Sequence, residues 1–141
     1  MVENFHGAKA AVFIDELLLL YRRDPDVPWG GMWDMPGGGR EGVETPRQCL
    51  ARELMEEFQL EFSDAEELWH TQVPAMNSAG EAAWFFVIRF PSNWDARICF
   101  GDEGQEWRLF SVKDALSLPN LIAPLRARLC LWLRREGDRK Q

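Results

Sequence analysis

The sequence predicts a mixed α/β (α+β) fold in which helices pack against a β-sheet. Residues 82–90 are aromatic and β-branched, as in a buried strand. Residues 46–58 form an amphipathic helix pattern in mid-chain, between expected strands. A second helix with a different apolar face is expected near the C-terminus, after Pro119. A helix between strands and another at the end of the chain indicate an α+β fold or a three-layer α/β/α sandwich.

Length and composition indicate one folded domain over residues 1–141. Apolar residues make up 46% of the chain and seven residues are Trp, which excludes a disordered chain. The net charge of −7 argues against a nucleic-acid polymer or an anionic membrane as a partner. A nucleotide that carries a metal ion is not excluded, because the metal brings positive charge.

The cysteines and the hydropathy pattern predict a cytoplasmic protein. Cys49, Cys99 and Cys130 are odd in number and widely spaced, so we expect reduced thiols. Residues 1–11 lack the pattern of a signal peptide. No apolar run approaches the roughly 18 residues that a membrane span needs.

The N-terminal part predicts a hairpin followed by a loop. Residues 7–15 and 17–21 read as its two strands, and Arg22 and Arg23 end the second one. Arg23 is either a surface charge or a phosphate contact, because the guanidinium fork matches phosphate oxygens. Trp29 lies in the loop of residues 24–31, where it either stacks on a base or covers the edge of the core.

The helix of residues 46–58 begins with clear signals. Thr45 is a good N-cap, Pro46 suits the first position, and Gln48 completes a capping box. The side chains expected on its buried face are Leu50, Ala51, Leu54 and Phe58.

Glu53, Glu56 and Glu57 occupy a second face of this helix, at spacing i, i+3 and i+4. Like charges at this spacing cost about 0.2–0.5 kcal/mol per pair, so the cluster is either a solvated acidic face or a metal site. Clustered carboxylates suit Mg²⁺, Mn²⁺ or Ca²⁺.

The second half predicts alternating strands and helices. Residues 68–73 are expected to pair with the strand at 82–90, and residues 97–100 are expected to form a short strand. A loop at 101–107, a strand to Phe110 and a helical turn at 112–118 follow. The last helix is expected to open at Pro119, with one apolar face made of Ile122, Leu125, Leu129 and Trp132.

The stretch from the glycines to the acidic helix resembles the Nudix hydrolase signature. It covers 23 residues, and eight of its nine specified positions agree; the ninth, a Gly, is Gln59. A left-handed Gln there would cost about 1 kcal/mol. The matching residues are Gly38, Glu44, Arg52, Glu53, Leu54, Glu56, Glu57 and Leu60.

The resemblance implies a Nudix-type α/β/α sandwich, with a mixed sheet between helices, and hydrolysis of a diphosphate bond in a nucleoside diphosphate derivative. It implies that Mg²⁺ or Mn²⁺ is held by Glu53, Glu56, Glu57 and the Gly37 carbonyl. Either Glu53 or Glu57 is expected to be the base. Arg52 is expected to orient a carboxylate and Glu44 to brace the start of the helix.

The resemblance also implies further site residues. Glu103 is expected as an extra metal ligand or general base, with Glu106 in reserve. Arg23 is expected to hold the substrate, Gly38 to let the backbone approach the phosphates, and Asn120 to read the purine. Specificity is expected from loops 22–31, 74–80 and 91–106.

Three functions are consistent with the sequence. The first is a Nudix pyrophosphohydrolase for nucleoside triphosphates, oxidised purines included, or for nucleotide sugars such as ADP-ribose. The second is a non-catalytic Nudix-like nucleotide-binding module, and the third a structural domain with an acidic helix. The expected partner is a small nucleotide, and the protein is expected to be a monomer or a homodimer.

Overall fold

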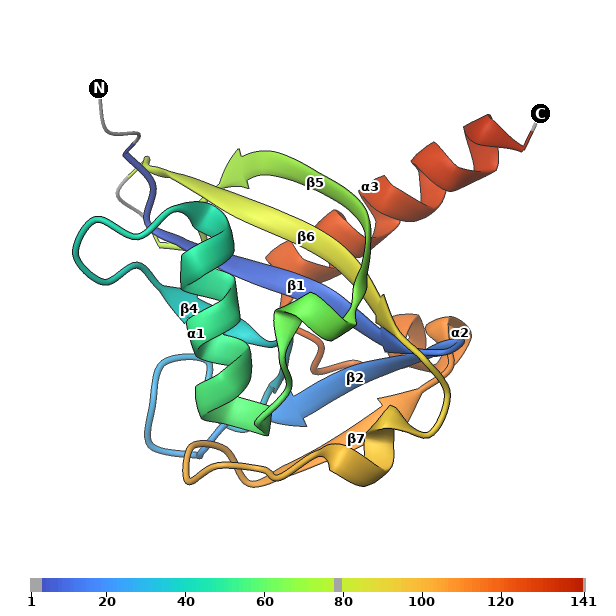
Figure 1. Cartoon of the computed structure of the whole chain (residues 1–141), viewed down its shortest axis with the longest axis horizontal. Coiled ribbons are helices and arrows are strands. Elements are labelled where there is room, and N and C mark those ends of the chain that lie inside the picture. The colour runs from blue at the N-terminus through green and yellow to red at the C-terminus, as the bar shows by residue number, and fades with distance from the viewer. Residues whose placement is uncertain (1–3, 78–79, 141) are drawn as a thin grey trace.

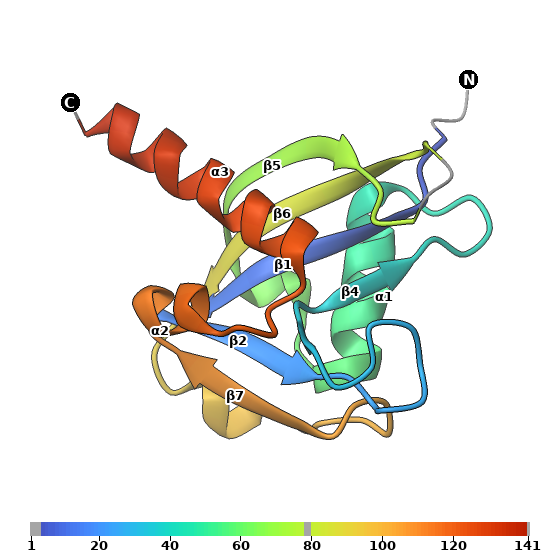
Figure 2. The same cartoon turned by 180° about the vertical axis from the view of Figure 1, so that it is seen from behind.

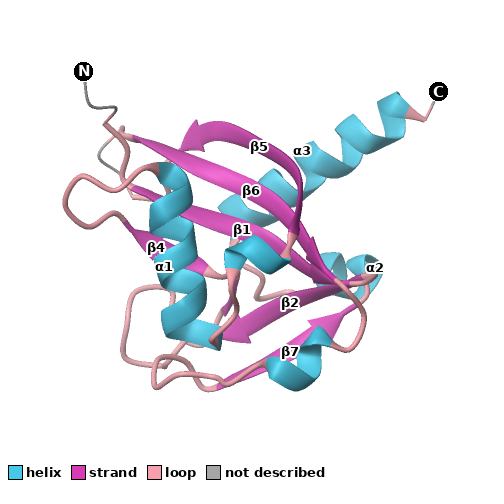
Figure 3. Ribbon diagram, in the orientation of Figure 1, coloured by secondary structure: helices cyan, strands magenta, loops and turns pink. Residues whose placement is uncertain are grey.

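The computed structural model describes residues 4–77 and 80–140, and a seven-stranded sheet lies between its helices (Figure 1). The strands are β1 (Gly7–Ile14), β2 (Leu17–Arg22), β3 (Trp33–Asp34), β4 (Gly37–Gly39), β5 (Glu66–Pro74), β6 (Ala82–Phe90) and β7 (Glu106–Phe110). The helices are α1 (Pro46–Phe58), α2 (Val112–Ser117) and α3 (Ala123–Arg139), with 3₁₀ turns at Phe62–Asp64 and Trp94–Arg97. The predicted mixed α/β sandwich is confirmed (Figure 3).

Strand β1 lies at the centre of the sheet, in the order β3-β2-β1-β6-β5. It pairs in parallel with β6 and antiparallel with β2 and β4, while β7 pairs with β2. The predicted hairpin is β1–β2, in which Val12 faces Leu19. The pairing of β5 with β6 is also as predicted. Ser78 and Ala79, in the predicted loop 74–80, lie outside the described residues.

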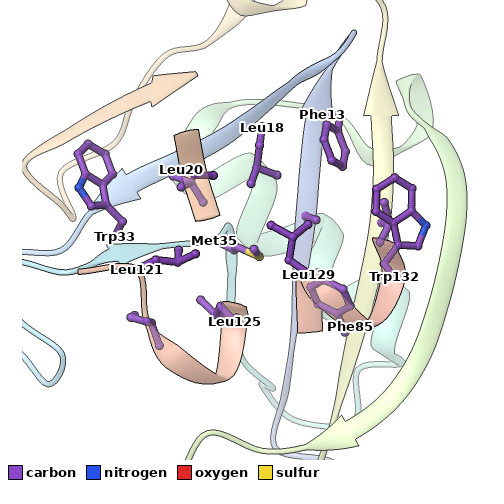
Figure 4. Packing of buried hydrophobic residues seen from close by; sticks show 14 of the residues in the cluster. Phe13, Leu18, Leu20, Trp33, Met35, Phe85, Leu121, Leu125, Leu129 and Trp132 are labelled. Carbon is purple, nitrogen blue, oxygen red and sulfur yellow. The ribbon is translucent and has the colours of Figure 1, made fainter. Parts of the chain in front are cut away.

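Side chains on the central strands alternate between two hydrophobic clusters, one on each face of the sheet. Helix α1 covers one face and α3 the other (Figure 2). Figure 4 shows the α3 side, where Leu125, Leu129 and Trp132 pack on β1, β2 and β6. The fully buried side chains of α1 on the opposite face are Cys49, Leu50, Leu54 and Phe58.

Helix α1 begins as the sequence predicts. The Thr45 side chain accepts a hydrogen bond from the Gln48 backbone N–H, and the Gln48 side chain accepts one from the Thr45 N–H. The helix ends at Gln59, which has φ 54° and ψ 36°. This is the left-handed region that glycine occupies without steric cost.

Two predicted elements are wrong. Residues 97–100 form no strand, because the Cys99 N–H donates to the Phe58 carbonyl at the end of α1. Helix α3 begins at Ala123 and not at Pro119, because residues 120–122 run beside β3. There the Trp33 N–H donates to the Asn120 carbonyl, and the Ile122 N–H donates to the Trp33 carbonyl.

The three cysteines are free, and Cys49, a residue of α1, is buried. Across residues 4–77 and 80–140, no helix has both the length and the apolar character needed to cross a membrane.

Replacing Gln59 with Gly should raise the free energy of unfolding by about 1 kcal/mol. The left-handed conformation costs an L-residue roughly 1–2 kcal/mol, part of which the flexibility of glycine in the unfolded chain offsets. Thermal or urea unfolding would measure the gain. Gln59→Ala is the control, because it keeps a Cβ in the left-handed region. Equal stability of the Gly and Ala variants would contradict this account of the helix end.

Candidate functional site

A cleft of about 540 Å³ opens beside β4, a size common for small-molecule sites. Its walls come from β4, the start of β1, α1, loop 24–31, the β5–β6 connection, Glu103 and Arg128 of α3. Since α1 and α3 lie on opposite faces of the sheet (Figures 1 and 2), the cleft joins side chains from both outer layers.

Glu57 is the most buried acid of α1, with 8% of its surface exposed. Its carboxylate lines the cleft and accepts a hydrogen bond from the Gly37 backbone N–H at 2.9 Å. Burial raises the pKa of Glu57 to about 8, although Lys9 and the Gly37 N–H oppose the shift. The neighbouring Glu53 raises it further.

Glu53 also lines the cleft, with its side chain 14% exposed. Burial raises its pKa, and the adjacent Arg52 partly offsets the shift. The carboxylate rests directly on Gly38, where an added Cβ would lie 2.6 Å from Oε1 of Glu53. Gly38 is therefore needed for this acid to lie against the loop.

Arg52 lies outside the cleft lining and links the acids around the start and outer face of α1. Its guanidinium binds both oxygens of Glu44, at 2.8 and 3.1 Å, and donates to the Gly39 carbonyl. It also contacts Glu53 at 3.0 Å and Glu56 at 3.3 Å. The hydrogen bond from Arg52 lowers the pKa of Glu44. These contacts are consistent with the orienting role expected for Arg52 and the bracing role expected for Glu44.

The three acids of the predicted cluster do not share one environment. Glu53 and Glu57 line the cleft, whereas the Glu56 side chain is 56% exposed and lies outside the lining. Within the described part of the chain, no three His, Cys, Asp or Glu side chains are grouped so that they alone could hold a metal ion.

Lys9 is a cleft residue that the sequence reasoning missed. Its ammonium lies 3.0 Å from Asp34 and donates to the carbonyls of Met35, at 3.2 Å, and Gly37, at 3.3 Å. It therefore contacts the same glycine whose N–H holds Glu57. The available signal was a single charge within the apolar strand of residues 7–14.

Asp34 was also missed, and it is fully buried. Besides Lys9, its carboxylate accepts hydrogen bonds from Arg23 at 2.9 Å, the Tyr21 hydroxyl at 3.1 Å and the Met35 N–H at 2.7 Å. Burial, together with the Asp34 charge, raises the pKa of the Tyr21 hydroxyl, so this group stays a donor.

Arg23 and Trp29 lie in the cleft wall, where substrate contacts were expected. The Nε of Arg23 donates to the Pro28 carbonyl at 2.7 Å, which ties loop 24–31 to the end of β2. Trp29 is 41% exposed and has φ 61°, so this loop presents an aromatic surface to solvent in a strained backbone conformation.

Of the remaining residues that were expected at the site, only Glu103 lines the cleft. Glu103 lines the cleft and is exposed, whereas Glu106 forms an ion pair with Arg108 at 2.6 Å. Asn120 does not line the cleft; its side chain donates to the Gly31 carbonyl at 3.3 Å. Its role as a purine-reading residue stays a prediction.

The donor set fits a hard divalent cation. Two carboxylates, of Glu53 and Glu57, and the strand that carries the Gly37 carbonyl line one cleft, and such cations prefer oxygen ligands. The pKa of both carboxyl groups is raised, so their negative charge lacks compensation that a cation would supply. Water or phosphate oxygens would complete the coordination.

In the metal-free protein, Glu57→Gln should raise stability at pH 8 by at least about 1 kcal/mol and by little at pH 4.5. Between pH 4.5 and about 8 the folded protein binds more protons at Glu57 than the unfolded chain does. The contribution of Glu57 to stability therefore falls as the pH rises through this range. Urea unfolding in a chelator at both pH values measures the difference. A pH-independent effect would contradict the assigned burial of this charge.

The comparisons with known proteins agree with this geometry. A family model described as NUDIX domain matches residues 5–133. The 8-oxo-dGTP diphosphatase of Proteus vulgaris is 59% identical over 29 residues, which are 21% of this chain and 26% of that protein. That match therefore spans about a quarter of the length of the curated relative.

Two solved structures share the fold. The Ap4A hydrolase binary complex of C. elegans has a TM-score of 0.75 at 17% identity, over 94% of this chain and 98% of that one. The MutT protein of Methanosarcina mazei Go1 has a TM-score of 0.72 at 19% identity, over 100% and 99%. With a family model that spans all but the ends of the sequence, the chain belongs to the NUDIX domain family, the family of the Nudix hydrolases.

Proposed function

We propose that this chain is a Nudix pyrophosphohydrolase that uses Mg²⁺ or Mn²⁺ to cleave a diphosphate bond in a nucleoside triphosphate, oxidised purine nucleotides included. The observation that carries the proposal is a buried carboxylate, Glu57, beside a half-buried one, Glu53, in a cleft of nucleotide size beside the Gly37 carbonyl. The short match to an 8-oxo-dGTP diphosphatase supports a triphosphate over a nucleotide sugar.

The reaction needs water to attack one phosphorus atom while the bond to the bridging oxygen breaks. The water loses a proton, and the bridging oxygen leaves with the second phosphate product. Such transition states need charge neutralisation and alignment more than covalent chemistry. A divalent ion in the cleft would supply the positive charge and polarise the water.

The chain's own residues supply the ligands and the proton acceptor. Glu53, Glu56, Glu57 and the Gly37 carbonyl would hold the metal. Of these, Glu53 and Glu57 are the candidate bases, and Glu103, which also lines the cleft, is a third. Arg52 keeps Glu53 in place through a charge-assisted hydrogen bond. The exposed Glu56 would reach the metal only through its long, solvated side chain.

The remaining cleft residues would bind the nucleotide. Arg23 would contact phosphate oxygens, and Gly38 would let them approach the backbone. Trp29 offers a face on which a base can stack. Asn120 is proposed as a base contact, next to loop 24–31 through its hydrogen bond to Gly31.

The other expectations stand as part of this proposal. They are a single domain over residues 1–141, a cytoplasmic location, a monomer or homodimer, and a small nucleotide as partner in place of a nucleic-acid polymer or a membrane.

Glu57→Gln should lower turnover by more than about 100-fold while the fold survives, because it removes a charged metal ligand. Phosphate release with Mg²⁺ would be measured on nucleoside triphosphates, oxidised purine triphosphates, ADP-ribose and other nucleotide sugars. Glu61→Gln is the matched control, since Glu61 is exposed and outside the cleft.

A substrate hydrolysed by the wild type and the control, but not by Glu57→Gln, is the expected result. Near-normal turnover by Glu57→Gln would refute the role of this acid. No turnover by the wild type, with nucleotide binding retained, would identify a binding module.

Mg²⁺ should raise the melting temperature of the wild type, because a ligand of the folded state stabilises it by mass action. At ten times the dissociation constant the gain is roughly 1.4 kcal/mol, or a shift of several degrees. Glu53→Gln and Glu57→Gln should each reduce the shift, and Glu61→Gln should not. An equal shift in all four proteins would place the bound metal elsewhere.

A further inference from the structure

Arg128 is a buried cation in the cleft that the proposed chemistry does not use. It projects from α3, is 5% exposed and lines the cleft. Its one hydrogen bond to a described residue runs from Nη2 to the Pro74 carbonyl, at 2.8 Å. No carboxylate of the described residues forms an ion pair with it.

The unused donors of Arg128 remain accessible. A guanidinium has five N–H donors, and its geometry provides two edges with two parallel donors each. One bond from Nη2 uses a donor of only one edge, so the other edge stays complete. Among the described residues, two side-chain nitrogens are fully shielded from solvent and lack a hydrogen-bond partner, Arg22 Nε and Trp132 Nε1. The Nε and Nη1 atoms of Arg128 also lack a partner among these residues but are not in this group. These donors of Arg128 are therefore accessible.

Other cationic side chains near the cleft already have ion-pair or hydrogen-bond partners. Lys9 and Arg23 both pair with Asp34. Arg126, two residues before Arg128 on α3, donates to the carbonyls of Leu116 and Leu118 and so has a structural role. Burial lowers the pKa of Arg128 to about 10, although the charge of Asp34, which forms no ion pair with it, opposes the shift. The fold thus buries a charge whose donors it leaves largely unused, which is costly unless a ligand completes them.

The position of Arg128 in the cleft indicates which part of a bound nucleotide it would contact. The acids Glu53 and Glu57 belong to α1, on the opposite face of the sheet from α3 (Figure 2). If the phosphates bind at the acids, as the proposed function requires, the base extends toward the α3 side. Ala83, which belongs to the cluster packed under α3, also lines the cleft, and its small side chain takes up little of that space.

We propose that Arg128 is a specificity-determining residue that binds the carbonyl edge of the base and selects a 6-oxopurine over a 6-aminopurine. The two parallel donors of an arginine match the O6 and N7 acceptors of a 6-oxopurine that is not oxidised at C8. In adenine the 6-amino group puts donors where O6 would be, against the donors of Arg128. This proposal rests on the proposed function only for the direction in which the nucleotide binds.

The test compares inosine and adenosine monophosphate, which differ only in the group at position 6 and in the hydrogen on N1, and which contain no diphosphate bond. Their dissociation constants, with Mg²⁺ present, would be measured by calorimetry for the wild type, Arg128→Met, Arg128→Lys and Arg134→Met. Arg128→Met keeps the length of the side chain without its donors. Arg128→Lys keeps the charge but cannot form two parallel bonds. Arg134 is exposed on the same helix and outside the cleft.

The wild type and Arg134→Met should bind the inosine nucleotide about tenfold or more tightly than the adenosine nucleotide. Arg128→Met should reduce that ratio to about threefold or less by weakening the inosine complex alone. Arg128→Lys should lie between them, which keeps the test decisive if the Met variant does not fold. A structural role alone would weaken both complexes equally.

An unchanged ratio in the Arg128 variants, equal binding of both nucleotides by the wild type, or binding of neither would overturn the proposal. Failure of the wild type to hydrolyse any nucleotide would contradict the proposed function, while the binding ratio would still test Arg128.

Discussion

The carboxylate of Asp34 accepts three hydrogen bonds and forms an ion pair with Lys9, and the cleft depends on these four contacts. Lys9 reaches it from β1, Tyr21 and Arg23 from β2, and the Met35 N–H from the chain that continues toward β4. The buried Asp34 carboxylate thus positions two cationic side chains, the Tyr21 hydroxyl and the backbone that leads into β4. Removing one partner of a buried ion pair typically costs about 3–5 kcal/mol, because the remaining charges lose their compensation. The geometry of the cleft is therefore linked to the stability of the sheet centre.

Negative and positive side chains lie on different sides of the cleft. Acids from α1 lie on one side, and the guanidinium of Arg128, which pairs with no carboxylate of residues 4–77 and 80–140, enters from α3. With a net charge of −7, the protein repels a free nucleotide polyphosphate at long range. A metal–nucleotide complex carries less negative charge and would bring the cation proposed to bind at Glu53 and Glu57. The charge distribution consequently favours such a complex over the free nucleotide, and it agrees with the proposed placement of phosphates at the acids and of the base at Arg128.

Local features were predictable from the sequence, and long-range ones were not. The start of α1 depends on Thr45 and Gln48, three residues apart, so its cap could be read directly. The apolar, aromatic and β-branched runs of β1, β2 and β6 likewise identified the core strands. Lys9 and Asp34 are 25 positions apart and meet only through strand pairing, so neither looked functional alone. Residues 97–100 and 119–122 were assigned by local pattern, whereas their backbone partners are the end of α1 and β3.

The end of α1 is fastened to the segment that leads to Glu103. The carbonyls of Phe58 and Glu57 accept hydrogen bonds from the N–H groups of Cys99 and Gly101. On the far side, the Gln105 N–H donates to the Arg22 carbonyl. The Gly104 N–H donates to Asp24, so residues 102 and 103 are a short insert between fixed anchors. Such an insert can change in sequence or length without moving the helix register or β2, so this position gives an evolving or engineered enzyme a way to alter the cleft wall while the acids of α1 stay in place.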